Sequence, residues 1–201
     1  MEVRIREYRP GDSEELLEVF HLSNDSLRVS RGGNHPDERI DKLQSYPKKH
    51  TLRHLTHNAV VLVAEAEGEI AGFGGFSNGL LEKILKSTYG KSLYVRPEYQ
   101  RGKKGVSIGS LLYSARRKEA ARRGFRKLYS YSVPEAVAFQ KKQGATFHPF
   151  HDTYSLNPEV KTSYFELELR KSFLNNVRVE PYIFELRVLI SRLFRFLEGE
   201  R

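Results

Sequence analysis

The pattern of apolar and polar positions predicts a chain in which strands and helices are mixed. Residues 59–66 (AVVLVAEA) form a short apolar run rich in β-branched residues, which is typical of a buried strand. A Glu-Gly-Glu turn follows, and residues 70–76 form a second such run, so the two predict a β-hairpin. Three glycines lie in or at the second run and indicate a bulge or the close approach of another backbone: Gly72, Gly74 and Gly75.

The residues before the hairpin predict a strand, a turn, a helix and an irregular insert. Apolar and polar residues alternate over residues 3–8, which indicates a strand, and Pro10-Gly11 interrupts the strand. Apolar residues then recur at helical spacing from Leu16 to Phe20. Residues 24–58 are polar, and we expect one or two short helices within this insert.

The residues after the hairpin predict an alternation of helices and strands. We expect a helix at 80–90, a strand at 92–96, a helix at 108–123, a strand at 126–133, a helix at 134–143, and two β-type segments around Phe147 and at 164–169. Gly124 and Gly144 fit the ends of the two later helices, because glycine adopts the left-handed conformation found there.

Residues 181–198 predict an amphipathic helix with a broad apolar stripe. Such a helix packs on its own domain, pairs with a second subunit or lies on anionic lipid. Because a stripe of this width needs burial, we favour packing or a homodimer. We therefore predict an α/β (α+β) domain over 1–172 and a helical extension over 173–201.

Composition and charge narrow the class of protein. The 201 residues carry 34 basic and 25 acidic side chains, a net charge of +9, which favours anionic partners. The chain has no cysteine, which excludes disulfides, cysteine zinc sites and thiol nucleophiles. We see no signal-peptide core and no apolar run of membrane-spanning length, so we expect a cytoplasmic protein. One Met, no Trp and abundant Lys, Arg and Glu make the composition thermophile-like.

Residues 94–112 (YVRPEYQRGKKGVSIGSLL) carry the pattern with the most chemistry, running from a strand through a basic loop into a helix. The first amides of a helix have no partner within it, and they lie at the positive end of its dipole. Small residues let a phosphate approach that backbone closely, and the loop supplies Gly102, Gly105, Ser107 and Gly109. The loop therefore suits a diphosphate; a solvated loop with a helix cap is the alternative. It is not a Walker A loop, because it lacks a Gly-Lys-Ser/Thr triplet.

The sequence VRPEYQRG followed by SIGSLL resembles the acetyl-CoA loop of the GNAT superfamily of N-acetyltransferases. The order of predicted elements is similar to that family over residues 1–172, and residues 136–147 resemble its last helix and the strand after it. The resemblance implies a mixed, mostly antiparallel central sheet flanked by helices. It also implies transfer of an acetyl group from acetyl-CoA to an amine by direct attack in a ternary complex.

In such a protein the pantetheine arm of acetyl-CoA inserts between strands 92–96 and 126–133. A backbone N–H near Tyr94 or Val95 would polarise the acetyl carbonyl. The residues that the resemblance assigns to the cofactor are Leu93, Tyr94, Val95, Arg101, Gly102, Lys103, Lys104, Gly105, Val106, Ser107, Ile108, Gly109, Ser110 and Phe139.

The chain departs from the family pattern at the groups that move protons. The loop is longer than usual, and Ser107 stands where a glycine is usual. Val133 stands where Asn is frequent, and Gln140 where a Tyr often acts as general acid. These departures keep open a second function, a non-catalytic acyl-CoA-binding or RNA- or ribosome-associated module on the same fold.

Three residues remain as candidates for acid–base chemistry. Tyr131, on the same side of its strand as Tyr129, is a candidate acid, although paired tyrosines also serve as packing. Glu98 and His151 are candidate bases; the alternatives are charge complementarity at the helix end for Glu98 and simple exposure for His151.

The chain's basic runs and histidines give weaker signals. The arginines of the 108–123 helix predict a solvated outer face, with the adenosine 3′-phosphate or RNA as alternatives; no aromatic residues are interleaved for RNA stacking. His50, His54 and His57 would share one helical face, yet no carboxylate pattern completes a catalytic zinc set, so we expect no metal. The sequence does not identify the amine acceptor, and we expect the insert at 24–58 to contact it.

Overall fold

The computed structural model describes residues 1–30, 32, 43–102, 105–132, 134–147 and 163–169, all within one compact unit, Met1–Arg170. In chain order its elements are β1 (Val3–Glu7), η1 (Pro10–Asp12), α1 (Ser13–Ser30), α3 (Lys48–Thr56), β2 (Ala59–Ala66), β3 (Glu69–Ser77), α4 (Leu80–Leu85), β4 (Ser87–Val95), η2 (Pro97–Gly102), α5 (Ile108–Arg122), β5 (Lys127–Ser132), α6 (Pro134–Lys142), β6 (Thr146–Phe147) and β7 (Ser163–Glu168). The predicted extension at 173–201 and its boundary lie outside the described residues.

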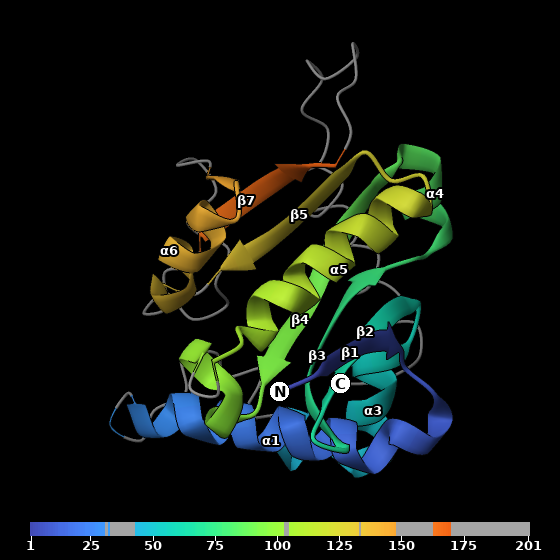
Figure 1. Ribbon diagram of the computed structural model, residues 1–201. Coiled ribbons are helices and arrows are strands. Elements are labelled where there is room, and N and C mark those ends of the chain that lie inside the picture. The colour runs from blue at the N-terminus through green and yellow to red at the C-terminus, as the bar shows by residue number, and fades with distance from the viewer. Residues whose placement is uncertain (31, 33–42, 103–104, 133, 148–162, 170–201) are drawn as a thin grey trace. The chain divides into compact units, whose positions relative to one another are not determined.

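A single sheet joins the strands in the order β1-β2-β3-β4-β5-β7-β6 (Figure 1). Every neighbouring pair is antiparallel except β4 and β5, which are parallel. The predicted mixed, mostly antiparallel sheet flanked by helices is therefore confirmed.

Helices cover both faces of the sheet, and β2 shows how the sequence specifies this. Val61 and Val63 pack with the apolar residues of α1 and α3 on one face. Val60 and Leu62 pack with α5 on the other. Successive side chains of a strand point to opposite faces, so a strand covered on both sides is apolar at nearly every position.

The predicted hairpin is formed by β2 and β3, and its glycines have the expected roles. Glu67 and Gly68 make the turn with positive φ angles of 55° and 85°. A Cβ at Gly75 would lie 2.7 Å from the carbonyl oxygen of Val60, so the backbones approach closely. The register of β3 against β4 shifts between Gly74 and Gly75, which is the predicted bulge.

Two predicted boundaries are wrong. The helix expected at 80–90 ends at Leu85, where Lys86 takes a left-handed conformation, and β4 begins at Ser87 rather than at 92. Pairing with β5 fixes this early part of β4, a long-range effect with no local signal. Helix α1 also continues past residue 24 to Ser30; within it the polar Asn24 is 3% exposed and donates to the carbonyl of Phe20.

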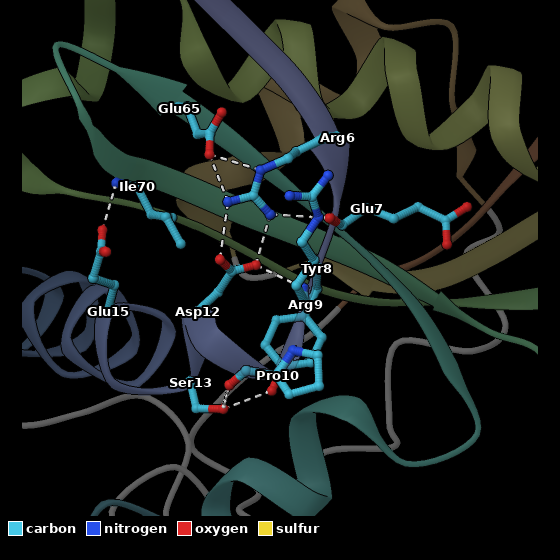
Figure 2. Close-up of polar contacts among 10 residues, drawn as sticks. All are labelled: Arg6, Glu7, Tyr8, Arg9, Pro10, Asp12, Ser13, Glu15, Glu65 and Ile70. Carbon is cyan, nitrogen blue, oxygen red and sulfur yellow. Dashed lines mark hydrogen bonds and ion pairs between the residues drawn. The ribbon is translucent and has the colours of Figure 1, made fainter.

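A network around Arg6 fixes where the chain turns from β1 into α1 (Figure 2). Its guanidinium donates to both carboxylate oxygens of Asp12, at 2.7 and 2.9 Å, and to Glu65 on β2 at 2.6 Å. Asp12 also accepts the backbone N–H of Arg9 at 2.6 Å. Hydrogen bonding from Arg6 holds the pKa of Asp12 below its ordinary value.

Replacing Asp12 with Asn is expected to lower the free energy of unfolding by about 2 kcal/mol at pH 7, because a charge-assisted bond to a mostly buried arginine is lost. Because the pKa of Asp12 is lower in the folded state, its carboxylate stabilises the fold at every pH above the ordinary carboxyl pKa. This stabilisation is lost as the pH falls through the folded-state pKa of Asp12. In urea denaturation the difference between the variant and the wild type should therefore begin to shrink below about pH 4 and disappear only below the folded-state pKa of Asp12. Asp25→Asn, at an exposed pair with Arg28, is the control and should change little; an equal loss in both variants would contradict the account.

Candidate functional site

The sheet divides between β4 and β5, and this division defines the candidate site. The two strands pair only from Ser87 with Lys127 to Tyr89 with Tyr129, although β4 continues to Val95 and β5 to Ser132. Where the pairing stops, the Ser130 hydroxyl donates to the carbonyl of Gly90 at 2.7 Å. Beyond this point β4 and β5 no longer pair, and they run apart toward their C-terminal ends (Figure 1).

The alternation of β4 determines which of its amides face β5. The N–H of Arg96 donates to the carbonyl of Ala71 in β3, so the backbone groups of Tyr94, two residues earlier, also face β3. Those of Leu93 and Val95 face the opposite side, where β5 has diverged. The carbonyl of Val95 there accepts the side-chain amide of Gln100 at 2.8 Å. Of the two amides named for the acetyl carbonyl, that of Val95 faces the divergence.

The N-terminus of α5 lies at the open end of this divergence. Ser107 is the N-cap, and its side chain makes no capping bond; its hydroxyl instead donates to Ser110 at 2.9 Å. The bond from Leu111 N–H to Ser107 C=O begins the helical series, so the amides of Ile108, Gly109 and Ser110 precede it. These amides and the positive helix end suit a diphosphate.

The two loop glycines differ in what they allow. Gly105 is exposed and has a φ of 79°, a conformation that favours glycine. Gly109 has an ordinary φ, and a Cβ placed there would meet nothing nearer than a Val95 methyl at 3.9 Å. Space is therefore open above the first turn of α5, beside the end of β4.

The other predicted cofactor residues are distributed around this point. Ile108 is fully buried and anchors the helix start in the core, while Val106 is half-buried. Phe139 on α6 packs edge-on against Tyr113 on α5, with ring centroids 5.6 Å apart. Arg101 and Gly102 end η2, but the side chain of Arg101 is not described. Lys103 and Lys104 lie outside the described residues.

The structure separates the acid–base candidates. Glu98 is exposed on η2. The pKa of Arg96 is raised, against the effect of burial, mainly by its hydrogen bond to Glu18, and Glu98 adds only a small contribution. Tyr131 lies in β5 opposite Tyr164 of β7, but its side chain is not among those described, and His151 lies outside the described residues. Gln140, which the resemblance sets at the position of the family's tyrosine, is 7% exposed, and its side-chain oxygen has no hydrogen-bond partner among the described residues.

Two other sequence predictions change. His57 is not on a helical face with His50 and His54, because α3 ends at Thr56 and His57 is extended. No group of three potential metal ligands occurs among the described residues. The predicted solvated face of α5 holds for Arg122, whose side chain is 68% exposed, but is wrong for Arg116, which is 3% exposed.

No helix in the described ranges is both long and apolar enough to cross a membrane.

Comparison with known proteins agrees with this geometry. The model of the acetyltransferase (GNAT) family matches residues 16–145, which include strands β2 to β5, the divergence and α5. The chain belongs to the GNAT family of acetyltransferases. No curated protein matches it.

Solved structures share the fold at low sequence identity. The PaiA N-acetyltransferase of Thermoplasma acidophilum in complex with coenzyme A is 20% identical, with a TM-score of 0.61 over 84% of this chain and 99% of that one. YncA of Salmonella typhimurium, described as a putative acetyltransferase with acetyl-CoA, is 17% identical, with a TM-score of 0.61 over 88% and 99%. The ribosomal-protein-S18-alanine N-acetyltransferase of Escherichia coli is 14% identical, with the same TM-score and coverage.

Proposed function

We propose that this chain is an N-acetyltransferase that passes the acetyl group of acetyl-CoA to an amine by direct attack in a ternary complex. The observation that carries the proposal is the divergence of β4 and β5 with the N-terminus of α5 at its open end. Membership of the GNAT family and a neighbour solved with acetyl-CoA support it.

In this proposal the chain holds the two ends of the donor by different means. The amides of Ile108, Gly109 and Ser110 bind the diphosphate. The amides of Leu93 and Val95 pair with the pantetheine arm as an added strand would. Acetyl-CoA supplies an acetyl group activated as a thioester, and a β4 amide orients and polarises its carbonyl.

The amine must lose a proton to present a lone pair, and the departing sulfur takes up negative charge. Glu98 and His151 remain our candidates for the base and Tyr131 for the acid. We place the acceptor against the 24–58 insert. A cytoplasmic location, the thermophile-like character and a homodimer through residues 173–201 stay predictions from the sequence.

A second candidate is a non-catalytic acyl-CoA-binding or RNA-associated module. Gln140 favours it, because a buried amide cannot supply the proton that a tyrosine would. In this case the chain would bind CoA without turnover.

Two measurements separate these functions. Thermal unfolding with acetyl-CoA, CoA or RNA tests which molecule the folded chain binds, because a ligand of the native state raises Tm. Release of the CoA thiol in the presence of a panel of small amines and peptide N-termini then tests turnover. Stabilisation by CoA with thiol release that depends on an amine supports the enzyme; stabilisation without release from any amine supports the second candidate.

A further inference from the structure

Arg116 on α5 is a buried cation without a carboxylate partner among the described residues. Its side chain donates to the carbonyl of Lys91 at 3.3 Å, and its guanidinium carbon lies 4.8 Å from the centre of the Tyr113 ring. Its Nε–H is buried and has no acceptor in the part of the chain that the structure describes. Arg96, which is also buried, differs from Arg116 in that its guanidinium pairs with the carboxylate of Glu18.

Arg116 lies where β4 and β5 stop pairing. A Cβ at Gly90 would lie 3.4 Å from Nη1 of Arg116 and 3.4 Å from Cβ of Ser130, so the guanidinium reaches the closed end of the divergence from the α5 side. Glycine at position 90 leaves room for it there.

The two ends of the divergence are aligned with α5. Gly109, in the first turn of α5, lies beside Val95, and Arg116 lies beside Lys91. These positions are about 10 Å apart along the helix and about 13 Å apart along the strand. An arm whose diphosphate binds at Gly109 and which runs along β4 therefore brings its far end, the thioester, toward Arg116.

Among the described residues, the charged and titratable groups around Arg116 do not neutralise its cation. Burial lowers the pKa of its guanidinium, and Tyr113 and Tyr89 oppose that effect. Tyr129 of β5 packs its ring against Tyr89. The Lys91 ammonium is directed away toward α3 by bonds to the carbonyls of His54 and His57. An anion at the closed end would provide the missing compensation.

We propose that Arg116 stabilises the thiolate of CoA as the acetyl group leaves it, an inference that rests on the function proposed above. The amine nitrogen forms a bond to the carbonyl carbon, the carbon–sulfur bond breaks, and its electron pair passes to sulfur. The proton lost by the amine goes to a base or to solvent. The guanidinium keeps its own protons, and the thiolate that it stabilises then takes a proton from the candidate acid Tyr131 or from solvent.

This assignment explains how the chain manages with Gln140 in place of a tyrosine. A neutral amide cannot protonate the leaving sulfur. A guanidinium, always protonated, lowers the energy of a thiolate by its charge, as neighbouring cations do for protein thiolates.

The experiment is a pH titration of the CoA thiol in the complex. The ultraviolet absorbance of the thiolate reports its ionisation, and the complex with desulfo-CoA, which lacks the thiol, serves as the reference. We expect the thiol pKa to fall by about one unit or more relative to free CoA, a tenfold or greater gain in thiolate. Arg116→Met should abolish that fall, and Arg116→Lys should keep part of it. Arg122→Met, which removes an exposed cation of the same helix, should leave the fall unchanged.

Turnover gives a second reading. Arg116→Met should lower kcat with an active amine by about 100-fold, as loss of one stabilising group typically does, and change KM for acetyl-CoA little. A wild-type complex whose thiol titrates like free CoA would overturn the inference, and this result needs no variant to fold. A chain that binds no CoA at all would overturn the proposed function instead.

Discussion

Replacing Gly109 with leucine is expected to weaken binding of CoA by about 100-fold while the fold persists. In the free protein the new side chain projects into open space beside Val95, and leucine is a better helix former than glycine. In the complex the same space is the approach of the diphosphate to the amides of Ile108, Gly109 and Ser110. Isothermal titration calorimetry measures the change in affinity, and the Tm of the free protein checks the fold.

Ser114→Leu is the matched control, because it adds the same side chain at an exposed position of α5, away from its first turn. It should bind CoA as the wild type does. Unchanged affinity in Gly109→Leu would show that the diphosphate does not approach the helix at this residue, and the assignment of the loop would fail.

Replacing Gly72 with valine is expected to lower the free energy of unfolding by about 3 kcal/mol, at the upper end of what overpacking costs. A Cβ there would lie 2.8 Å from the carbonyl oxygen of Tyr94 and 3.2 Å from both Ile108 and Leu112. The substitution therefore presses apart β3, β4 and the start of α5, the three elements that form the site. Urea denaturation measures the loss, and CoA affinity should fall with it.

Gly11→Ala is the control for Gly72→Val. Nothing lies within 4 Å of a Cβ at Gly11, and its φ is not in the left-handed region, so alanine should be neutral or slightly stabilising. A Gly72→Val protein as stable as Gly11→Ala would contradict the packing described here.

Local sequence patterns predicted the buried hairpin and the helix ends, because neighbouring residues determine these features. The apolar runs of β2 and β3 are covered on both faces, and Gly124 and Gly144 end their helices with φ angles of 90° and 86°. Helix α5 begins at the predicted residue, because a Ser-Ile-Gly start and a helical repeat need no distant partner. The resemblance supplied the mixed, mostly antiparallel character of the sheet, which no local pattern contains.

The parts that were missed depend on distant contacts. Ser87–Tyr89 are polar or aromatic and belong to β4 because they pair with β5, some forty residues later. Arg116 sits in a run of basic residues with nothing to separate it from the solvated Arg122; its burial follows from the position of Gly90 across the helix–sheet interface. A glycine in a strand opposite a long polar side chain is the one signal that could have indicated this contact.

The most direct test of the account is a crystal structure of the protein with CoA. The account predicts the diphosphate on the amides of residues 105–110 and the pantetheine arm between β4 and β5, along the side of Leu93 and Val95. A structure with CoA bound elsewhere, or with the first turn of α5 free of phosphate, would contradict it.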